Sequence, residues 1–207
     1  MIRLIAPFVL GPVARLLLVP ILFLAFAPPA DALTPQALTR AAPSLNPHVA
    51  ERAAMAISCM EAHGEAPSRL IVVDMALHAD QKRLWAFDVS SPDHAELLLT
   101  DWVAHGSGSD PDRDGRPERF SNRVNSHMTS LGAYRIAERY YGKNGWSRRL
   151  DGLMDGLNSQ ARQRAVVMHP SAYVRPGSVG RSQGCPAVRE EVMAMLEREG
   201  IDNALLW

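Results

Sequence analysis

From residue 69 onward, the chain alternates short apolar runs with polar turns. The runs are rich in Val, Ile, Leu, Trp and Tyr, and they lie too close together for intervening helices, which favours strands. The pattern therefore predicts a mainly β domain built on an antiparallel sheet. The runs are RLIVVDM at 69–75, RLWAFDV at 83–89, ELLLTDWVAH at 96–105 and LGAYRIAERYY at 131–141.

Residues 46–63 instead show the spacing of an amphipathic helix. Asn46 is a favourable N-cap, Pro47 suits the first helical position, and Gly64 ends the pattern. The apolar positions that recur on one face are Val49, Ala53, Ala56, Ile57 and Met60. We expect this helix to pack against the β domain, and we assign it no function.

A second helix is predicted near the carboxyl end. Acidic side chains begin it at Glu190 and Glu191, Arg198 lies in its last turn, and Gly200 ends it, which matches the helix macrodipole. Its apolar face is outlined by Val188, Val192, Met195 and Leu196. A last strand is predicted over 204–207. The predicted helices are expected to lie at the periphery of the sheet.

The amino terminus has the three parts of a secretory signal peptide. Arg3 supplies a positive charge, residues 16–27 (LLLVPILFLAFA) form an apolar core, and residues 30–32 (ADA) fit a cleavage site. The alternative is an uncleaved membrane anchor, but prolines and Arg15 interrupt the segment, and the apolar run is shorter than a spanning helix requires. We expect residues 1–32 to be removed during export. The mature protein is then expected in the periplasm or cell envelope, without stable membrane insertion.

Composition removes one class of partner and restricts the chemistry. The chain has 22 basic and 22 acidic residues, so its charge gives no support for a nucleic-acid partner. The only cysteines are Cys59 and Cys185, which in an exported protein could form a disulfide. If Cys185 is instead a nucleophile, Cys59 is expected to be a small buried residue on its helix face.

Residues 165–188 (AVVMHPSAYVRPGSVGRSQGCPAV) contain the parts of a cysteine nucleophile and its base. An apolar run ends on His169, and a tight turn with Gly184 presents Cys185, just ahead of the second predicted helix. A thiol near its ordinary pKa needs an imidazole or a helix N-terminus to become a good nucleophile. From spacing alone, a structural cysteine beside a Gly-Pro turn and a strand-end histidine are equally consistent with this pattern.

These strings resemble the signature of the murein L,D-transpeptidase (YkuD-like) catalytic domain, in the branch with a GRSxGCPAV nucleophile turn. The likeness covers residues 69–207, with 33–68 as an amino-terminal extension. Besides HPSAYV and GRSQGCPAV, it includes VAHG at 103–106, FSN at 120–122, TSLGAYRI at 129–136, YYGK at 140–143, RLDGL at 149–153 and residues 161–169. It implies a mostly β sandwich or flattened barrel whose cleft holds the histidine and the cysteine.

The resemblance also implies a reaction and a set of site residues. Cys185 would attack a peptidoglycan stem peptide at its third, diamino-acid residue, expel the terminal D-alanine and form a thioester, with His169 as general base. The backbone carbonyl of Pro170 would orient the His169 ring, and the amides of Gln183, Gly184 and Cys185 would form the oxyanion hole. Substrate contacts are expected from Tyr173, Arg181 and Ser182, and no cofactor or metal is expected.

The chain departs from the commonest family signature, which has S-H-G-C with an Arg two residues later. Gln183 replaces the second His, Ala187 replaces the Arg, and Pro170 stands where a Gly commonly follows the first His. These differences leave His169 as the only local base. An L,D-carboxypeptidase with the same site, and a non-catalytic wall-binding module, therefore remain alternatives to a transpeptidase.

Two other features suggest metal binding but match poorly. Asp110, Asp112, Asp114 and Gly115 are spaced like the start of an EF-hand loop, yet position twelve is Ser121, so we expect a solvated surface loop. The histidines lack the paired spacing of a zinc centre, and most are expected on the surface or in loops. His105 and His127 are the two that could approach the cleft.

Overall fold

The computed structural model describes residues 32–91 and 94–207, so most of the predicted signal peptide lies outside the described residues. The three helices of this part are α1 (Pro35–Ala41), α2 (Pro47–Ala62) and α3 (Glu190–Arg198). None of them is long and apolar enough to cross a membrane. The strands are β1 (Arg69–Val73), β2 (Leu84–Asp88), β3 (Glu96–Asp101), β4 (Tyr134–Gly142), β5 (Gly145–Gly152), β6 (Val167–Pro170), β7 (Val174–Arg175), β8 (Ser178–Val179), β9 (Ala187–Val188) and β10 (Leu205–Leu206).

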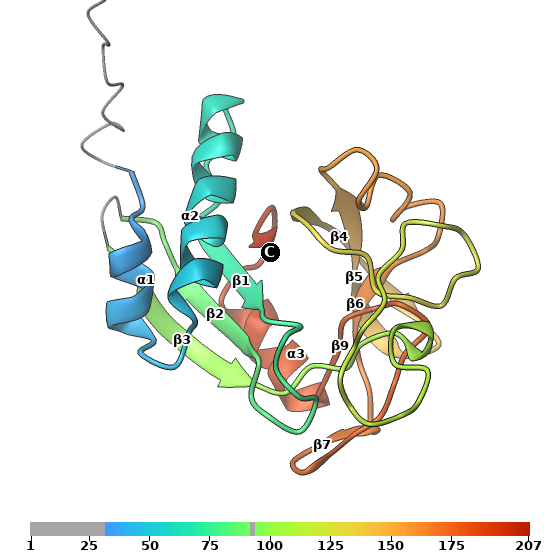
Figure 1. Cartoon of the computed structure of the whole chain (residues 1–207). Coiled ribbons are helices and arrows are strands. Elements are labelled where there is room, and N and C mark those ends of the chain that lie inside the picture. Colours follow the sequence, from blue (N-terminus) through green and yellow to red (C-terminus); the bar gives the residue numbers. More distant parts are fainter. Residues whose placement is uncertain (1–31, 92–93) are drawn as a thin grey trace, which may run out of the picture.

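Eight strands form one large sheet in the order β3-β2-β1-β10-β4-β5-β6-β9 (Figure 1). The mainly β fold with peripheral helices is therefore confirmed. The edge strand β9 meets the chain after β3 through an isolated bridge between Ala104 and Ala187, and the described sheet does not close into a barrel.

The prediction of an antiparallel sheet was wrong at two places. β10 pairs with β1 in parallel, with Leu70 opposite Leu205, and β9 pairs with β6 in parallel, with His169 opposite Ala187. Both parallel pairs follow from long connections that return the chain to the sheet in the same direction. The apolar runs do not encode these connections, so they could not reveal the parallel pairs.

Apolar side chains from both faces of the sheet are buried. Leu70 and Val72 of β1 join a core with α1 and α2, whereas Ile71 joins a second core with α3. Figure 1 shows α1 and α2 over one side of β1, β2 and β3 and α3 behind the sheet. This two-sided burial explains why these strands read as continuous apolar runs rather than as an alternating pattern.

Helix α2 forms where its sequence predicts. The Asn46 side chain accepts a hydrogen bond of 2.9 Å from the His48 N–H, Pro47 is the first helical residue, and Gly64 has a φ of +81° beyond the last turn. Ile57, Met60 and all but the last of its alanines pack in the first core, which confirms the amphipathic helix. Cys59, however, is exposed, so the prediction that it is buried was wrong.

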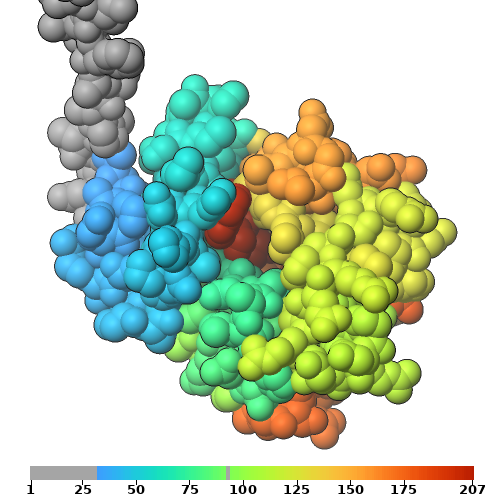
Figure 2. All heavy atoms as spheres, viewed as in Figure 1, coloured from blue at the N-terminus to red at the C-terminus, as the bar shows by residue number. Residues whose placement is uncertain are grey.

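The carboxyl end also agrees with its predicted elements. α3 spans Glu190–Arg198, and the last strand, β10, is shorter than predicted. Val192 and Leu196 are buried on the helix as predicted, but Met193 is buried in place of Met195 and Val188 belongs to β9. Figure 2 shows the C-terminal residues, coloured red, at the bottom of a hollow beside α2. An apolar cavity of about 420 Å³ lies here, lined by residues that include Met55, Met154 and Trp207.

Candidate active site

His169 and Cys185 lie on adjacent segments and line one cavity of about 560 Å³. His169 belongs to β6, and its N–H donates to the carbonyl of Pro186, the residue after Cys185, at 3.3 Å. The parallel pairing of β6 with β9 therefore places the imidazole and the thiol on the same cavity wall. No hydrogen bond joins the two side chains within the described residues, as is common before a substrate binds.

Close backbone contacts hold the turn that presents Cys185. Gly184 has a φ of +112°, and a Cβ added to it would lie 2.7 Å from the carbonyl oxygen of Met128. Ser182 accepts a hydrogen bond from the Gly184 N–H at 3.1 Å, and its hydroxyl donates to the Cys185 carbonyl at 2.6 Å. A glycine is required here because only it combines this φ with this close approach.

These bonds bear on two of the predicted roles. The Gly184 N–H donates to Ser182 in this structure, so an oxyanion would have to compete with that bond, and the oxyanion role of Gly184 stays a prediction. The N–H groups of Gln183 and Cys185 have no hydrogen-bond partner in the described part of the chain. Ser182 is buried and its hydroxyl is used within the turn, which favours a structural role over the predicted substrate contact.

The ring of His169 is held by the backbone next to it. Its Nδ1 lies 2.9 Å from the Pro170 carbonyl oxygen, so Nδ1–H donates and the neutral ring keeps Nε2 as an open acceptor. Burial lowers the pKa of His169, and the nearby charge of Lys143 lowers it further. The imidazole is therefore neutral, and able to accept a proton, at lower pH than an exposed histidine would be.

Burial raises the pKa of the Cys185 thiol, and a backbone hydrogen bond from Val167, together with the charges of Arg164 and Lys143, offsets only part of this shift. The predicted help from a helix N-terminus was wrong, because β9 follows the turn and α3 begins only at Glu190. Both described cysteines are free, so Cys185 is not held in a disulfide. Together these features favour a neutral thiol beside a neutral imidazole rather than a preformed ion pair.

Tyr173 and Arg181 line the same cavity, as predicted for substrate-binding residues. The Tyr173 ring meets the His169 ring edge-on, with 6.5 Å between centroids. Arg181 is tied to the neighbouring loop, since its Nη1 donates to the Asp110 carbonyl at 2.6 Å. The cavity also contains Lys143, to which the sequence reasoning gave no role, although it ends the YYGK string.

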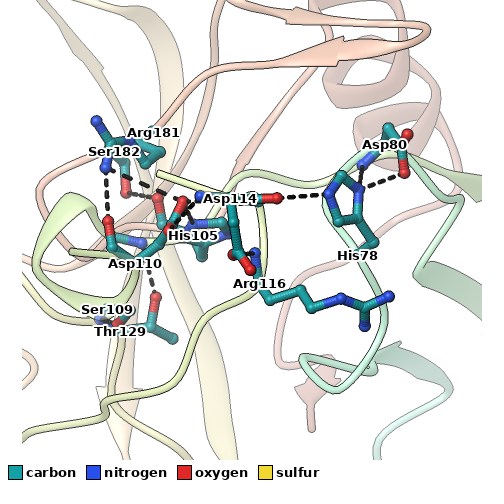
Figure 3. Close-up of polar contacts among 12 residues, drawn as sticks. His78, Asp80, His105, Ser109, Asp110, Asp114, Arg116, Thr129, Arg181 and Ser182 are labelled. Carbon is teal, nitrogen blue, oxygen red and sulfur yellow. Dashed lines mark hydrogen bonds and ion pairs between the residues drawn. The ribbon is translucent and has the colours of Figure 1, made fainter. Parts of the chain in front are cut away.

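A buried polar network lies behind the nucleophile turn (Figure 3). His105 is fully buried, with its Nδ1 2.7 Å from Nη2 of Arg83 and its Nε2 3.2 Å from Oδ2 of Asp110. Arg83 donates to Nδ1, so the ring is neutral and Nε2–H donates to Asp110. Burial lowers the pKa of His105 to about 4 and that of Arg83 to about 10.

This network corrects two expectations from the sequence. In the loop that was expected to be solvated, residues 111–114 are exposed but Asp110 is buried. Of the two histidines that were expected to approach the cleft, His127 lines the cavity, whereas His105 is fully buried and does not. Its backbone carbonyl accepts the N–H of Ser182 at 2.8 Å, which ties the network to the turn. The carboxylates of Asp110, Asp112 and Asp114 do lie within 4.8 Å of one another, but Asp110 already accepts N–H groups from Asp114 and Gly115.

The sequence matches the model of one known protein family. Residues 41–206 match the model of the L,D-transpeptidase catalytic domain family. The chain belongs to that family. The match begins before α2, so it includes a helix that the sequence reasoning placed in an extension, and the predicted boundary at residue 69 stays a prediction. No curated protein matches the chain significantly.

Solved structures of L,D-transpeptidases are similar to this domain at low identity. The enzyme of Mycobacterium smegmatis is 13% identical over 68% of this chain and 58% of its own, with a TM-score of 0.40. L,D-transpeptidase 1 of Mycobacterium tuberculosis is 13% identical over 68% and 61%, with a TM-score of 0.38. That of Xylanimonas cellulosilytica is 14% identical over 72% and 68%, with a TM-score of 0.37. The chain thus spans less than two thirds of the two mycobacterial chains.

The buried arginine of this L,D-transpeptidase domain gives a stability prediction. Arg83→Met should lower the free energy of unfolding by about 3–5 kcal/mol, because it leaves His105 and the Val103 carbonyl without a donor and removes one of the two positive charges near the buried Asp110, the other being Arg181. Urea unfolding followed by fluorescence would measure the change. Arg119→Met, at an exposed position of the loop after His105, should change it by less than about 0.5 kcal/mol. Equal values for both variants would contradict the prediction.

Proposed function

We propose that this domain is an exported cysteine acyltransferase that remodels or crosslinks peptidoglycan stem peptides. The observation that carries the proposal is the shared cavity of His169 and Cys185, with Nδ1 of His169 held by the Pro170 carbonyl. Family membership supports the substrate class, since L,D-transpeptidases are enzymes of the cell wall. The signal-peptide pattern at residues 1–32 supports export.

The neutral pair defines the first step. As the Cys185 sulfur attacks the carbonyl of the third stem residue, its proton passes to Nε2 of His169 and a C–S bond forms. The N–H groups of Gln183 and Cys185 donate to the oxyanion that develops. His169 then protonates the leaving nitrogen, the C–N bond breaks, and the terminal D-alanine departs from a thioester.

The second step returns the enzyme to its first state. An acceptor amine gives its proton to His169 and attacks the thioester, and the thiol leaves with that proton. A water molecule in place of the amine would give hydrolysis by the same steps. The pair His169 and Cys185 therefore serves transpeptidase and carboxypeptidase outcomes alike, and access to the thioester decides between them.

Purified tetrapeptide muropeptides provide the direct test. Incubation with the mature protein, followed by mass analysis, should show free D-alanine and a crosslinked dimer. Tripeptide monomers without dimers would assign the carboxypeptidase instead. Unchanged muropeptides, together with a Cys185 thiol that iodoacetamide alkylates no faster than a free model thiol, would favour the non-catalytic wall-binding module.

A further inference from the structure

The cavity that holds His169 and Cys185 is positively charged. Of the described residues that line it, none is an aspartate or a glutamate, whereas Lys143, Arg164 and Arg181 all contribute. A cleft with charge of one sign attracts ligands of the opposite sign and raises their local concentration. The cavity therefore fits an anionic substrate.

The two arginines are already used by the fold. Arg164 donates to the carbonyls of Ser121 at 2.7 Å and Met128 at 2.5 Å, which fixes the segment beneath Gly184. Arg181 donates to the Asp110 carbonyl at 2.6 Å. Their charge acts on the cavity, but most of their directional hydrogen bonding goes to the backbone.

Lys143 differs from both arginines. It is exposed, and no hydrogen bond or ion pair within the described residues engages its ammonium group. Its position is nonetheless fixed, because Gly142 pairs with Gly145 and leaves Lys143 and Asn144 as the two residues of the β4–β5 turn. A two-residue turn on a long hairpin offers a rigid base for the flexible side chain.

The charge of Lys143 also reaches both reacting groups. Lys143 lines the same cavity as His169 and Cys185, which places it near the position that the scissile carbonyl would take. In keeping with this, its charge lowers the pKa of His169 and opposes the rise in the pKa of Cys185. In a stem peptide with one residue beyond that carbonyl, the terminal carboxylate is the nearest negative charge. Neighbouring Cα atoms are only about 3.8 Å apart, so the carboxylate stays close to the reacting atoms.

We propose that Lys143 forms an anion subsite that binds the C-terminal carboxylate of the leaving residue, with its ammonium group donating to the carboxylate oxygens. The inference rests on the proposed function, since it assumes that a stem peptide enters this cavity. It makes the enzyme selective for stems that end one residue after the attacked carbonyl. A longer stem, or an amidated one, would place an uncharged group opposite Lys143.

The test compares two tetrapeptide stems that differ only at the C-terminus, one with a free carboxylate and one with a carboxamide. The wild-type protein should release the terminal residue faster from the free acid. In Lys143→Met, kcat/KM for the free acid should fall about tenfold to a hundredfold, chiefly through KM, as expected for the loss of a charge-assisted hydrogen bond. The carboxamide should lose far less, so the preference for the acid should collapse.

The chain offers a matched control, because its only other lysine is Lys82. Lys82 lies over the Trp102 ring, 5.1 Å from the centroid, and does not line the cavity. Lys82→Met should keep the wild-type preference, and Lys143→Arg should keep most of it because the charge remains. Alkylation of Cys185 near neutral pH should also slow in Lys143→Met, since the thiol pKa rises when the positive charge is removed.

The outcomes separate this inference from the proposed function. If wild-type protein releases the terminal residue equally well from both stems, or if Lys143→Met loses both equally, the carboxylate subsite is wrong and the acyl-transfer proposal stands. If wild-type protein acts on neither stem, both proposals fail. If Lys143→Met does not fold, the test uses the preference of the wild-type protein for the free acid over the carboxamide. This preference should weaken as added salt screens the ion pair. A preference that salt does not change would overturn the inference.

Discussion

Cys185→Ala should abolish turnover of stem peptides while leaving the fold intact. Cys185 is the proposed nucleophile, and without its sulfur no thioester forms, so the rate should fall by several orders of magnitude, on the order of the losses seen when other covalent nucleophiles are removed. The fold should survive because the thiol is only partly buried, and its contact with the Ala165 carbonyl, at 4.0 Å, is too long to contribute much stability. Product release measured by mass spectrometry, with circular dichroism for the fold, checks both parts.

The second cysteine supplies the control for this substitution. Cys59 is an exposed residue of α2 and does not line the cavity that contains His169 and Cys185. Cys59→Ala should therefore retain both activity and stability. Substantial turnover by well-folded Cys185→Ala protein would remove the acyl-enzyme mechanism. Equal losses in the two variants would point instead to a general effect of removing a thiol.

His169→Gln should reduce kcat/KM by at least about a hundredfold, the lower end of what general base catalysis contributes. Glutamine can still donate a hydrogen bond to the Pro170 carbonyl, but its amide cannot accept a proton from the thiol. Alkylation of Cys185 near neutral pH should slow as well. His127→Gln is the matched control, because His127 lines the same cavity without a contact to the Pro170 carbonyl.

The pH profile of the wild-type protein follows from the same residue. His169 acts as a base only when neutral, so activity should fall as pH drops through its folded-state pKa. Burial and Lys143 lower that pKa, so the acid limb of kcat/KM should lie below the ordinary histidine range. An acid limb at or above that range, or near-normal activity in His169→Gln, would place the base elsewhere.

Local sequence determined much of the fold and indicated the pair of residues that we propose to react. The cap at Asn46, the proline at position 47 and the recurring apolar face predict the position of α2 from local residues alone. The apolar runs predicted the central strands because a strand buried on both faces needs such a run. His169 and Cys185 were found because one strand and one glycine turn lie within a single short stretch of sequence.

Only the tertiary structure decided the features that depend on distant segments. The parallel pairs β1–β10 and β6–β9 arise from long connections. Burial of His105 and Asp110 requires Arg83 from the segment just before β2, and the charge of the cavity requires Lys143 from the β4–β5 turn. A residue's neighbours in sequence set its backbone conformation, whereas its burial, its pKa and its partners depend on which remote residues surround it.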